Sequence, residues 1–186
     1  MNVCVVIACY NRREFTLRIL DQLDRYFPED LPFTVTLVDG GSTDETPRFV
    51  AEKFPWVKVI IRDGAYWNQA MRIGIESAKK ETFTHLLMLN DDVDILPKSI
   101  ARLIEYSKRL EFDDKILVGK CIDPVSSKVT YGALTRKSRI SKLSFRLLEE
   151  DEMYGLTMNG NCALIPKSVI DKLGNLSDKF IHSGGD

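Results

Sequence analysis

The sequence predicts one α/β domain in which a mainly parallel central sheet carries helices on both faces. Apolar runs with the length of buried strands alternate with segments whose apolar residues recur every three or four positions. Sequential units of this kind imply a parallel sheet, because each parallel connection has to cross one face of it. With 186 residues, of which 44% are hydrophobic and 28% charged, the chain can bury one sizeable core.

The first 110 residues contain four strand–helix units. A helix begins near Phe15 and keeps its apolar residues on one face until Pro28 ends the pattern. The fourth helix opens at Pro97, a residue favoured in the first turn, and carries an apolar stripe from Ile100 to Leu110. The expected strands are 2–9, 33–38, 57–62 and 84–90, and the other helices are 44–54 and 66–80.

The regular alternation of predicted strands and helices ends after Leu110. The sequence predicts short strands at 116–120 and 128–134, a basic and less regular segment at 137–146, an apolar strand within 154–166 and a short helix that ends at Leu173. Residues 1–110 therefore form the first half of the domain, and 111–186 elaborate it. Neither a linker nor an internal repeat separates the two halves.

Charge and hydropathy limit the partners. The formal net charge of -1 gives no general attraction to nucleic acid, and the basic run at 136–146 has no aromatic interleaving. We interpret that run as a solvated face or as a contact with a membrane surface or an anionic acceptor. No apolar run reaches the roughly 18 residues of a membrane span, and Met1 leads straight into a strand. We therefore expect a cytoplasmic protein, compatible with peripheral contact at the inner face of a membrane.

The four cysteines, Cys4, Cys9, Cys121 and Cys162, are too far apart in the sequence for a CxxC metal site. Three of them stand in apolar, strand-like surroundings. We interpret all four as small buried hydrophobic residues.

Polar residues cluster where three of the predicted strands end: at 10–12, at 39–44 and at 90–92. The carboxyl ends of parallel strands meet at one edge of the sheet, where ligands bind in α/β proteins. Taken alone, the second cluster also suits a loop that caps the next helix, and the third suits a solvated acidic turn. The coincidence of three clusters favours a binding crevice.

The third cluster places Asp91, Asp92 and Asp94 directly after an apolar strand. Neighbouring carboxylates repel one another, and a hard divalent cation with oxygen ligands is a natural compensation. The sequence therefore predicts a divalent metal site at this edge, with a solvated role for Asp94.

Four segments in this order resemble the signatures of inverting family 2 glycosyltransferases, which have the Rossmann-like GT-A fold. The segments are ACYNR at 8–12, VDGGSTDET at 38–46, NQAMRIGI at 68–75 and LNDD at 89–92. The resemblance covers nearly the whole chain. It implies transfer of a sugar from a nucleotide-diphospho-sugar, such as a UDP- or dTDP-sugar, to a carbohydrate or lipid-linked acceptor in surface polysaccharide or glycoconjugate synthesis.

The resemblance also implies roles for individual residues on the donor side. Tyr10 would border the nucleobase, and Asp39 would accept a hydrogen bond from it. Asp91 would face the ribose or the metal, and Asp92 would bind the Mn²⁺ or Mg²⁺ that bridges the diphosphate. Asn90 stands where a strict DxD motif has an acid. Further donor-binding positions implied by the same signatures are Asn11, Gly41 and Asn68.

Asn68 lies four residues before Arg72, so one helical face is expected to meet the diphosphate side of the crevice, through either residue. Trp67, at the start of that helix, is interpreted as a core residue.

The C-terminal half supplies the acceptor side of this resemblance. Residues 154–166 look like the family's acceptor-side strand, and FIHSGGD at 180–186 resembles its "ED" segment, with Gly185 in place of the usual acid. Asp186 would be the catalytic base, and His182 is interpreted as a loop residue. A single in-line displacement follows, in which a base takes the acceptor proton as the nucleotide leaves.

Two other functions are considered. Family members continue beyond the position of Asp186, so we expect a chain truncated at its C-terminus in which donor binding survives better than transfer. The first alternative is therefore a nucleotide-sugar-binding module without turnover. The second, a sugar-1-phosphate nucleotidylyltransferase, is disfavoured because the glycine-rich and basic loop it needs after the first strand is missing.

Overall fold

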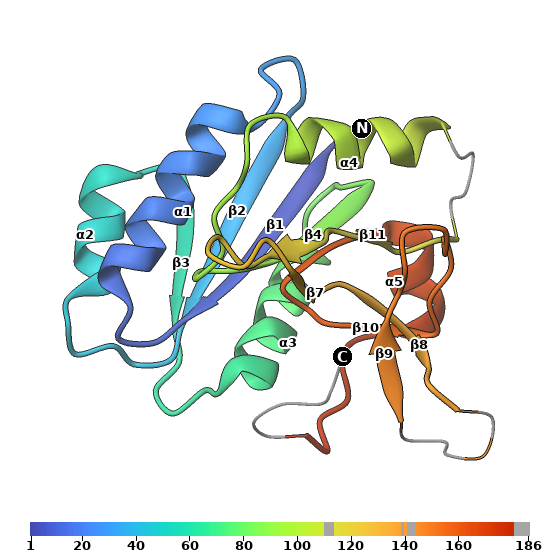
Figure 1. Ribbon diagram of the computed structural model, residues 1–186. Coiled ribbons are helices and arrows are strands. Elements are labelled where there is room, and N and C mark those ends of the chain that lie inside the picture. Colours follow the sequence, from blue (N-terminus) through green and yellow to red (C-terminus); the bar gives the residue numbers. More distant parts are fainter. Residues whose placement is uncertain (110–113, 139, 141–143, 181–186) are drawn as a thin grey trace.

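The structure is a computed structural model that describes residues 1–109, 114–138, 140 and 144–180. A six-stranded sheet runs through the molecule, with α1, α2 and α4 over one face and α3 and α5 over the other (Figure 1). The smaller strands β6 to β10 lie beside the end of the sheet that carries β11. The expected mixed α/β class with a mainly parallel sheet is confirmed.

The central sheet has the strand order β3-β2-β1-β4-β11-β5. Its first four members are mutually parallel, whereas β11 runs antiparallel to both β4 and β5. The strands are β1 (Val3–Cys9), β2 (Phe33–Asp39), β3 (Val57–Ile61), β4 (His85–Asn90), β5 (Leu117–Val118) and β11 (Cys162–Pro166). The carboxyl ends of β1, β2 and β4 therefore meet at one edge.

Strand β1 lies between β2 and β4, and all seven of its residues are buried. Its side chains alternate between the two faces, as the pleat of a strand requires. Val3, Val5 and Ile7 belong to the core under α1, α2 and α4, whereas Cys4 and Val6 belong to the core under α3 and α5. A strand buried on both faces is continuously apolar, which is why this run is so clear in the sequence.

The helices follow the apolar spacing in the sequence. In α1, the buried residues Thr16, Ile19, Leu20 and Leu23 recur at helical intervals, and the helix ends just before Pro28. The helices are α1 (Arg13–Tyr26), α2 (Thr46–Lys53), α3 (Trp67–Ala78), α4 (Ser99–Arg109) and α5 (Lys167–Leu173). None of the helices in the described ranges is long and apolar enough to cross a membrane.

Helix α3 lies unusually close to the sheet at Gly74. A Cβ built on this glycine would stand 2.2 Å from Cγ1 of Val6 in β1. The missing side chain therefore allows the helix backbone to rest directly on the central strand, and this sets the height of α3 above the sheet.

The structure corrects the expected bounds in three places. Helix α4 begins at Ser99 and not at Pro97, since Lys98 has a φ of 68°, which an α-helix cannot include. The single strand expected at 128–134 is two strands, β7 (Val129–Tyr131) and β8 (Ala133–Arg136), which belong to different sheets. The segment 154–166 likewise holds two strands, β10 (Thr157–Met158) and β11.

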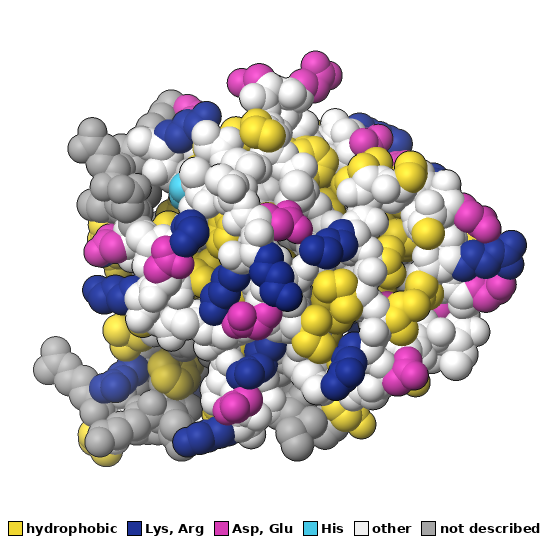
Figure 2. All heavy atoms as spheres, turned by 180° about the vertical axis from the view of Figure 1, so that it is seen from behind, with side chains coloured by type: hydrophobic (Ala, Val, Ile, Leu, Met, Phe, Trp, Pro, Cys, Tyr) yellow, Lys and Arg dark blue, Asp and Glu magenta, His cyan; other side chains and the backbone are white. Residues whose placement is uncertain are grey.

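The remaining strands form two small antiparallel sheets. Strand β6 (Cys121–Ile122) pairs with β7, while β8 lies between β10 and β9 (Phe145–Leu147). The basic segment contributes to the second of these sheets, and Arg146 is neutralised there by a two-pronged ion pair with Glu152, with N–O distances of 2.6 and 2.8 Å. On the face shown in Figure 2, Lys and Arg side chains are interspersed with Asp and Glu, in keeping with the net charge of -1.

Candidate functional site

A cavity of about 380 Å³ opens at the edge of the sheet where β1, β2 and β4 end. Each of the three polar clusters contributes to its wall: Tyr10 from the first, Gly41 from the second and Asp91 from the third. The loop after β3 adds Asp63, and the start of α3 adds Trp67. The volume lies in the range of pockets that hold small ligands, so the strand ends that the sequence predicted to converge surround a cavity of that size.

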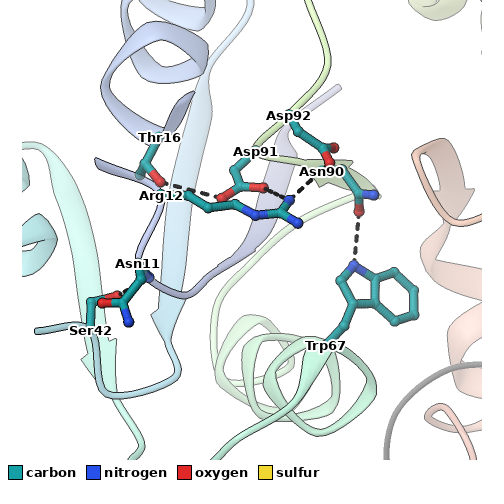
Figure 3. Close-up of polar contacts among 8 residues, drawn as sticks. All are labelled: Asn11, Arg12, Thr16, Ser42, Trp67, Asn90, Asp91 and Asp92. Carbon is teal, nitrogen blue, oxygen red and sulfur yellow. Dashed lines mark hydrogen bonds and ion pairs between the residues drawn. The ribbon is translucent and has the colours of Figure 1, made fainter. Parts of the chain in front are cut away.

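The loops after β1 and β2 are joined by hydrogen bonds in both directions. The backbone N–H of Asn11 donates to Oγ of Ser42 over 2.8 Å (Figure 3). Oδ1 of Asn11 accepts from the backbone N–H of Thr43 over 2.7 Å. Asn11 has a φ of 52°, a conformation that asparagine tolerates better than most residues. Its side chain thus shapes the rim of the cavity and is not part of the wall.

Asp44 caps two helices at once. Its Oδ2 accepts a hydrogen bond from the backbone N–H of Arg13 over 2.9 Å, and its Oδ1 accepts one from the backbone N–H of Thr46 over 3.1 Å. These residues are the first of α1 and α2. Burial acts to raise the pKa of Asp44, but the hydrogen bonds from Thr46 and Arg13 outweigh it and lower the pKa.

Asp39 is completely buried beneath this rim. Its Oδ1 accepts hydrogen bonds from the backbone N–H groups of Gly41 and Ser42, at 2.9 and 2.6 Å, and its Oδ2 contacts Sγ of Cys9 at 3.2 Å. Gly41 has a φ of 94°, and a Cβ there would lie 2.8 Å from Oδ1 of Asp63. The carboxylate of Asp39 therefore organises the loop, and its contact with a nucleobase stays a prediction.

Asp91 and Asp92 share one cation, the guanidinium of Arg12. Its Nη1 lies 3.1 Å from Oδ1 of Asp91 and 2.8 Å from Oδ2 of Asp92 (Figure 3). Thr16 of α1 donates a longer hydrogen bond, of 3.5 Å, to the other oxygen of Asp91. Burial raises the pKa of Asp91, and the charge of Arg12 offsets only part of that rise.

The environments of the two acids differ. The side chain of Asp91 is 4% exposed, whereas that of Asp92 is 40% exposed. Asp91 is therefore fixed by its surroundings, and Asp92 faces solvent.

Asn90, which was expected to stand where a DxD motif has its first acid, is held by Trp67. The indole Nε1–H donates to Oδ1 of Asn90 over 2.8 Å. Trp67 is only half-buried and lines the cavity, so its interpretation as a core residue holds for part of the ring alone. An amide at position 90 gives the indole an acceptor without adding a third carboxylate to the two that follow.

The side chains of Asn68 and Arg72 reach the C-terminal segment and not the cavity wall. Nδ2 of Asn68, a fully buried residue, donates to the backbone carbonyls of Ser177 and Phe180 over 2.9 and 2.6 Å. Arg72 donates to the carbonyl of Leu176 over 2.6 Å. The donor-binding role of Asn68 thus stays a prediction, and in this structure the residue anchors the segment at 176–180 to α3.

The structure brings together Tyr10, Gly41 and Asp91 as expected and places Asp92 beside them. It adds Arg12 and Asp63, which the sequence reasoning gave no role. The signal that could have found Arg12 is its place in the cluster at 10–12, since the carboxyl ends of parallel strands meet at the edge where the acids at 91 and 92 also lie. Asp186 and His182, as well as Arg139 and Lys142 of the basic run, lie outside the described residues.

The pair Asp91 and Asp92 suits a divalent ion that takes its remaining ligands from a substrate. Among the described residues no group of three or more His, Cys, Asp or Glu is placed to hold a metal ion. Mg²⁺ is commonly bound by one or two carboxylates together with substrate phosphates. Two adjacent carboxylates, of which one is exposed and faces solvent, fit that mode.

The sequence profile described as "Glycosyl transferase family 2" matches residues 4–174. The chain belongs to glycosyl transferase family 2. The match spans the three polar clusters, α3 and the antiparallel strand β11 of this family 2 chain. No curated protein is similar enough in sequence to be recognised as a relative.

Two solved structures share the fold of this family 2 glycosyltransferase. The mannosyltransferase PcManGT from Pyrobaculum calidifontis, in complex with GDP-Man and Mn²⁺, matches 94% of this chain and 47% of its own, with a TM-score of 0.62 and 16% identity. TarS of S. aureus, residues 1–349, matches 100% of this chain and 52% of its own, with a TM-score of 0.69 and 15% identity. The chain thus spans about half the length of both, and the likeness establishes the fold, which is the expected GT-A fold.

Proposed function

We propose that this glycosyltransferase moves a sugar from a nucleotide-diphospho-sugar to an acceptor hydroxyl, with inversion and with the help of a divalent metal ion. The observation that carries the proposal is the cavity at the sheet edge, whose wall combines Tyr10, the backbone of Gly41 and Asp91. Tyr10 is 57% exposed and offers an aromatic face for a nucleobase. The GDP-Man and Mn²⁺ of the mannosyltransferase complex support a donor of this class.

The acid pair is assigned to the metal and the diphosphate. A bound Mn²⁺ or Mg²⁺ would neutralise charge on the leaving diphosphate, an effect of several kcal/mol. Asp92 is the exposed ligand, and Asp91 is oriented from behind by Thr16. Asp186, in the position of the family's base, is assigned to take the proton from the acceptor hydroxyl.

Inversion follows from a single displacement, in which the acceptor attacks the sugar directly. A double displacement needs a nucleophile on the protein. Cys9 lines the cavity, but burial and the neighbouring charge of Asp39 raise the pKa of its thiol far above the ordinary range. Because a thiol has to ionise to attack, Cys9 is a poor nucleophile for a double displacement.

Calorimetric titration with UDP, dTDP and GDP, in Mn²⁺, in Mg²⁺ and in chelator, tests the donor and metal assignments. We expect one nucleotide to bind more tightly with metal, and this gain to collapse in Asp92→Ala. Asp94→Ala is the matched control, since Asp94 is 58% exposed and pairs with Arg18 away from the cavity. Equal affinities with metal and with chelator would contradict the metal assignment.

Turnover is tested with the corresponding nucleotide-sugars. Release of the nucleoside diphosphate, together with the anomeric configuration of the product by NMR, distinguishes inversion from retention. Donor binding without any product, over a panel of carbohydrate and lipid-linked acceptors, would instead favour a nucleotide-sugar-binding module.

A further inference from the structure

Arg12 stands at the junction of the acid pair and the cavity. It follows β1 directly, before the first residue of α1, and its side chain lines the cavity. A single nitrogen, Nη1, bridges the two carboxylates at 3.1 and 2.8 Å. The guanidinium is thus the cation that compensates Asp91 and Asp92 in the absence of ligand.

The pair needs such a cation. Asp91 is almost fully buried, and a buried carboxylate without a partner is costly. Burial alone would lower the pKa of Arg12, but the charges of Asp91 and Asp92 reverse the effect and raise it, so the guanidinium stays charged. One positive and two negative charges leave the cluster with an excess of one negative charge.

Arg12 is also accessible to a ligand in the cavity. Its side chain is 49% exposed, in contrast to the 4% of Asp91. The planar guanidinium forms two parallel hydrogen bonds with phosphate as readily as with carboxylate. A diphosphate in the cavity therefore competes with Asp92 for the same group.

We propose that Arg12 is an exchangeable counter-ion of the acid pair. In the nucleotide-free protein it holds Asp91 and Asp92; when a nucleoside diphosphate enters the cavity, Arg12 turns to the phosphates and leaves Asp92 open to a divalent ion. The inference rests on the proposed function and assigns an order of binding to the same site, with the nucleotide before the metal.

Binding of metal and nucleotide is then coupled through Arg12. Metal binds the nucleotide-free protein weakly, because Arg12 already occupies one oxygen of each acid and offsets part of their charge. The nucleotide removes that competition, and by linkage the metal strengthens nucleotide binding by the same factor. Direct coordination of the metal by phosphate adds to the coupling but does not need Arg12.

The experiment measures Mn²⁺ affinity by calorimetry, with and without saturating UDP or whichever nucleoside diphosphate the wild type binds. In Arg12→Gln we expect Mn²⁺ to bind the nucleotide-free protein about tenfold more tightly, which is the scale of one charged hydrogen bond. The gain in affinity that the nucleotide gives should shrink by a similar factor. In the same variant, nucleotide affinity in chelator should fall.

Arg18→Gln is the matched control. Arg18 forms an ion pair of 3.0 Å with Asp94 at similar exposure, but it does not line the cavity. All affinities should stay at their wild-type values. Arg12→Lys keeps a positive charge but loses the planar fork, so its Mn²⁺ affinity without nucleotide should lie between those of the wild type and Arg12→Gln. If Arg12→Gln does not fold, the comparison is made with Arg12→Lys.

Two results would overturn the inference in different ways. If Arg12→Gln, or Arg12→Lys in its place, binds Mn²⁺ no more tightly than the wild type in the absence of nucleotide, Arg12 is not the exchangeable counter-ion, while metal assistance itself stands. If no form binds Mn²⁺ even with nucleotide present, the metal assignment of the proposed function fails and this inference fails with it.

Discussion

Replacing Gly74 by alanine tests whether the missing side chain at this position is what allows α3 to rest directly on β1. The new Cβ would lie 2.2 Å from Cγ1 of Val6, more than 1 Å short of ordinary carbon–carbon contact at about 3.5 Å. Overpacking of this kind costs about 1–3 kcal/mol, whereas exchanging glycine for alanine inside a helix gains about 1 kcal/mol. Because the overlap is with a β-branched residue of the central strand, we expect the clash to dominate, with a net loss of up to about 2 kcal/mol.

A second substitution separates the two effects. Val6→Ala removes the methyl groups that the new Cβ meets, so in that background Gly74→Ala should change sign and stabilise the protein by up to about 1 kcal/mol. Urea unfolding of the wild type, both single variants and the double variant gives the four free energies of unfolding. If Gly74→Ala costs the same in both backgrounds, within about 0.5 kcal/mol, the contact with Val6 is not the cause and the reasoning is refuted.

Three further outcomes are expected. Burial raises the pKa of Asp91, so the contribution of this shift to stability is present below the ordinary pKa of an aspartate and is lost as the pH rises through the raised value. In urea unfolding, Asp91→Asn should therefore gain stability relative to the wild type as the pH rises through that value. A difference between the two proteins that stays constant with pH would contradict the shift. With Trp56→Phe as background, nucleotide binding should change the fluorescence of Trp67, which lines the cavity, and an unchanged spectrum at saturation would place the nucleotide elsewhere. Asp44→Ala, which uncaps two helices, should lower the free energy of unfolding by about 1–3 kcal/mol, measured in urea, whereas Asp44→Asn should lose less than half of that.

The first half of the fold was predictable because its signals are local. All seven residues of β1 are buried, so a continuous apolar run marked the strand, and Pro28 marked the end of the preceding helical pattern. In the second half the pairing depends on distant partners. The run at 128–134 is divided at Gly132, with β7 paired to β6 and β8 to β9 and β10, which no periodicity within the run reveals.

The edge at which the site lies was predictable, but the use of each polar side chain was not. Asn11 and Asp39 stand at the expected strand ends, yet their oxygens accept hydrogen bonds from the backbone of the loop after β2. Asparagine and aspartate suit both purposes, because they bind neighbouring N–H groups as well as ligands. The bridge from Arg12 to Asp91 joins residues 79 positions apart, so it required the fold.

The reciprocal bonds between the loops after β1 and β2 bear on the entropy of ligand binding. Asn11 is already bonded to Ser42 and Thr43, and Asp44 to the backbone of Arg13, before any ligand arrives. Ordering a loose loop costs about 1–2 kcal/mol for each residue whose backbone becomes fixed. Because the rim is ordered beforehand, binding does not have to fix its backbone. The contacts that we propose between the ligand and Tyr10 and Gly41 would then contribute to affinity without that loss. The site is thus divided into a preorganised half, which receives the ligand, and a half around Arg12 that rearranges.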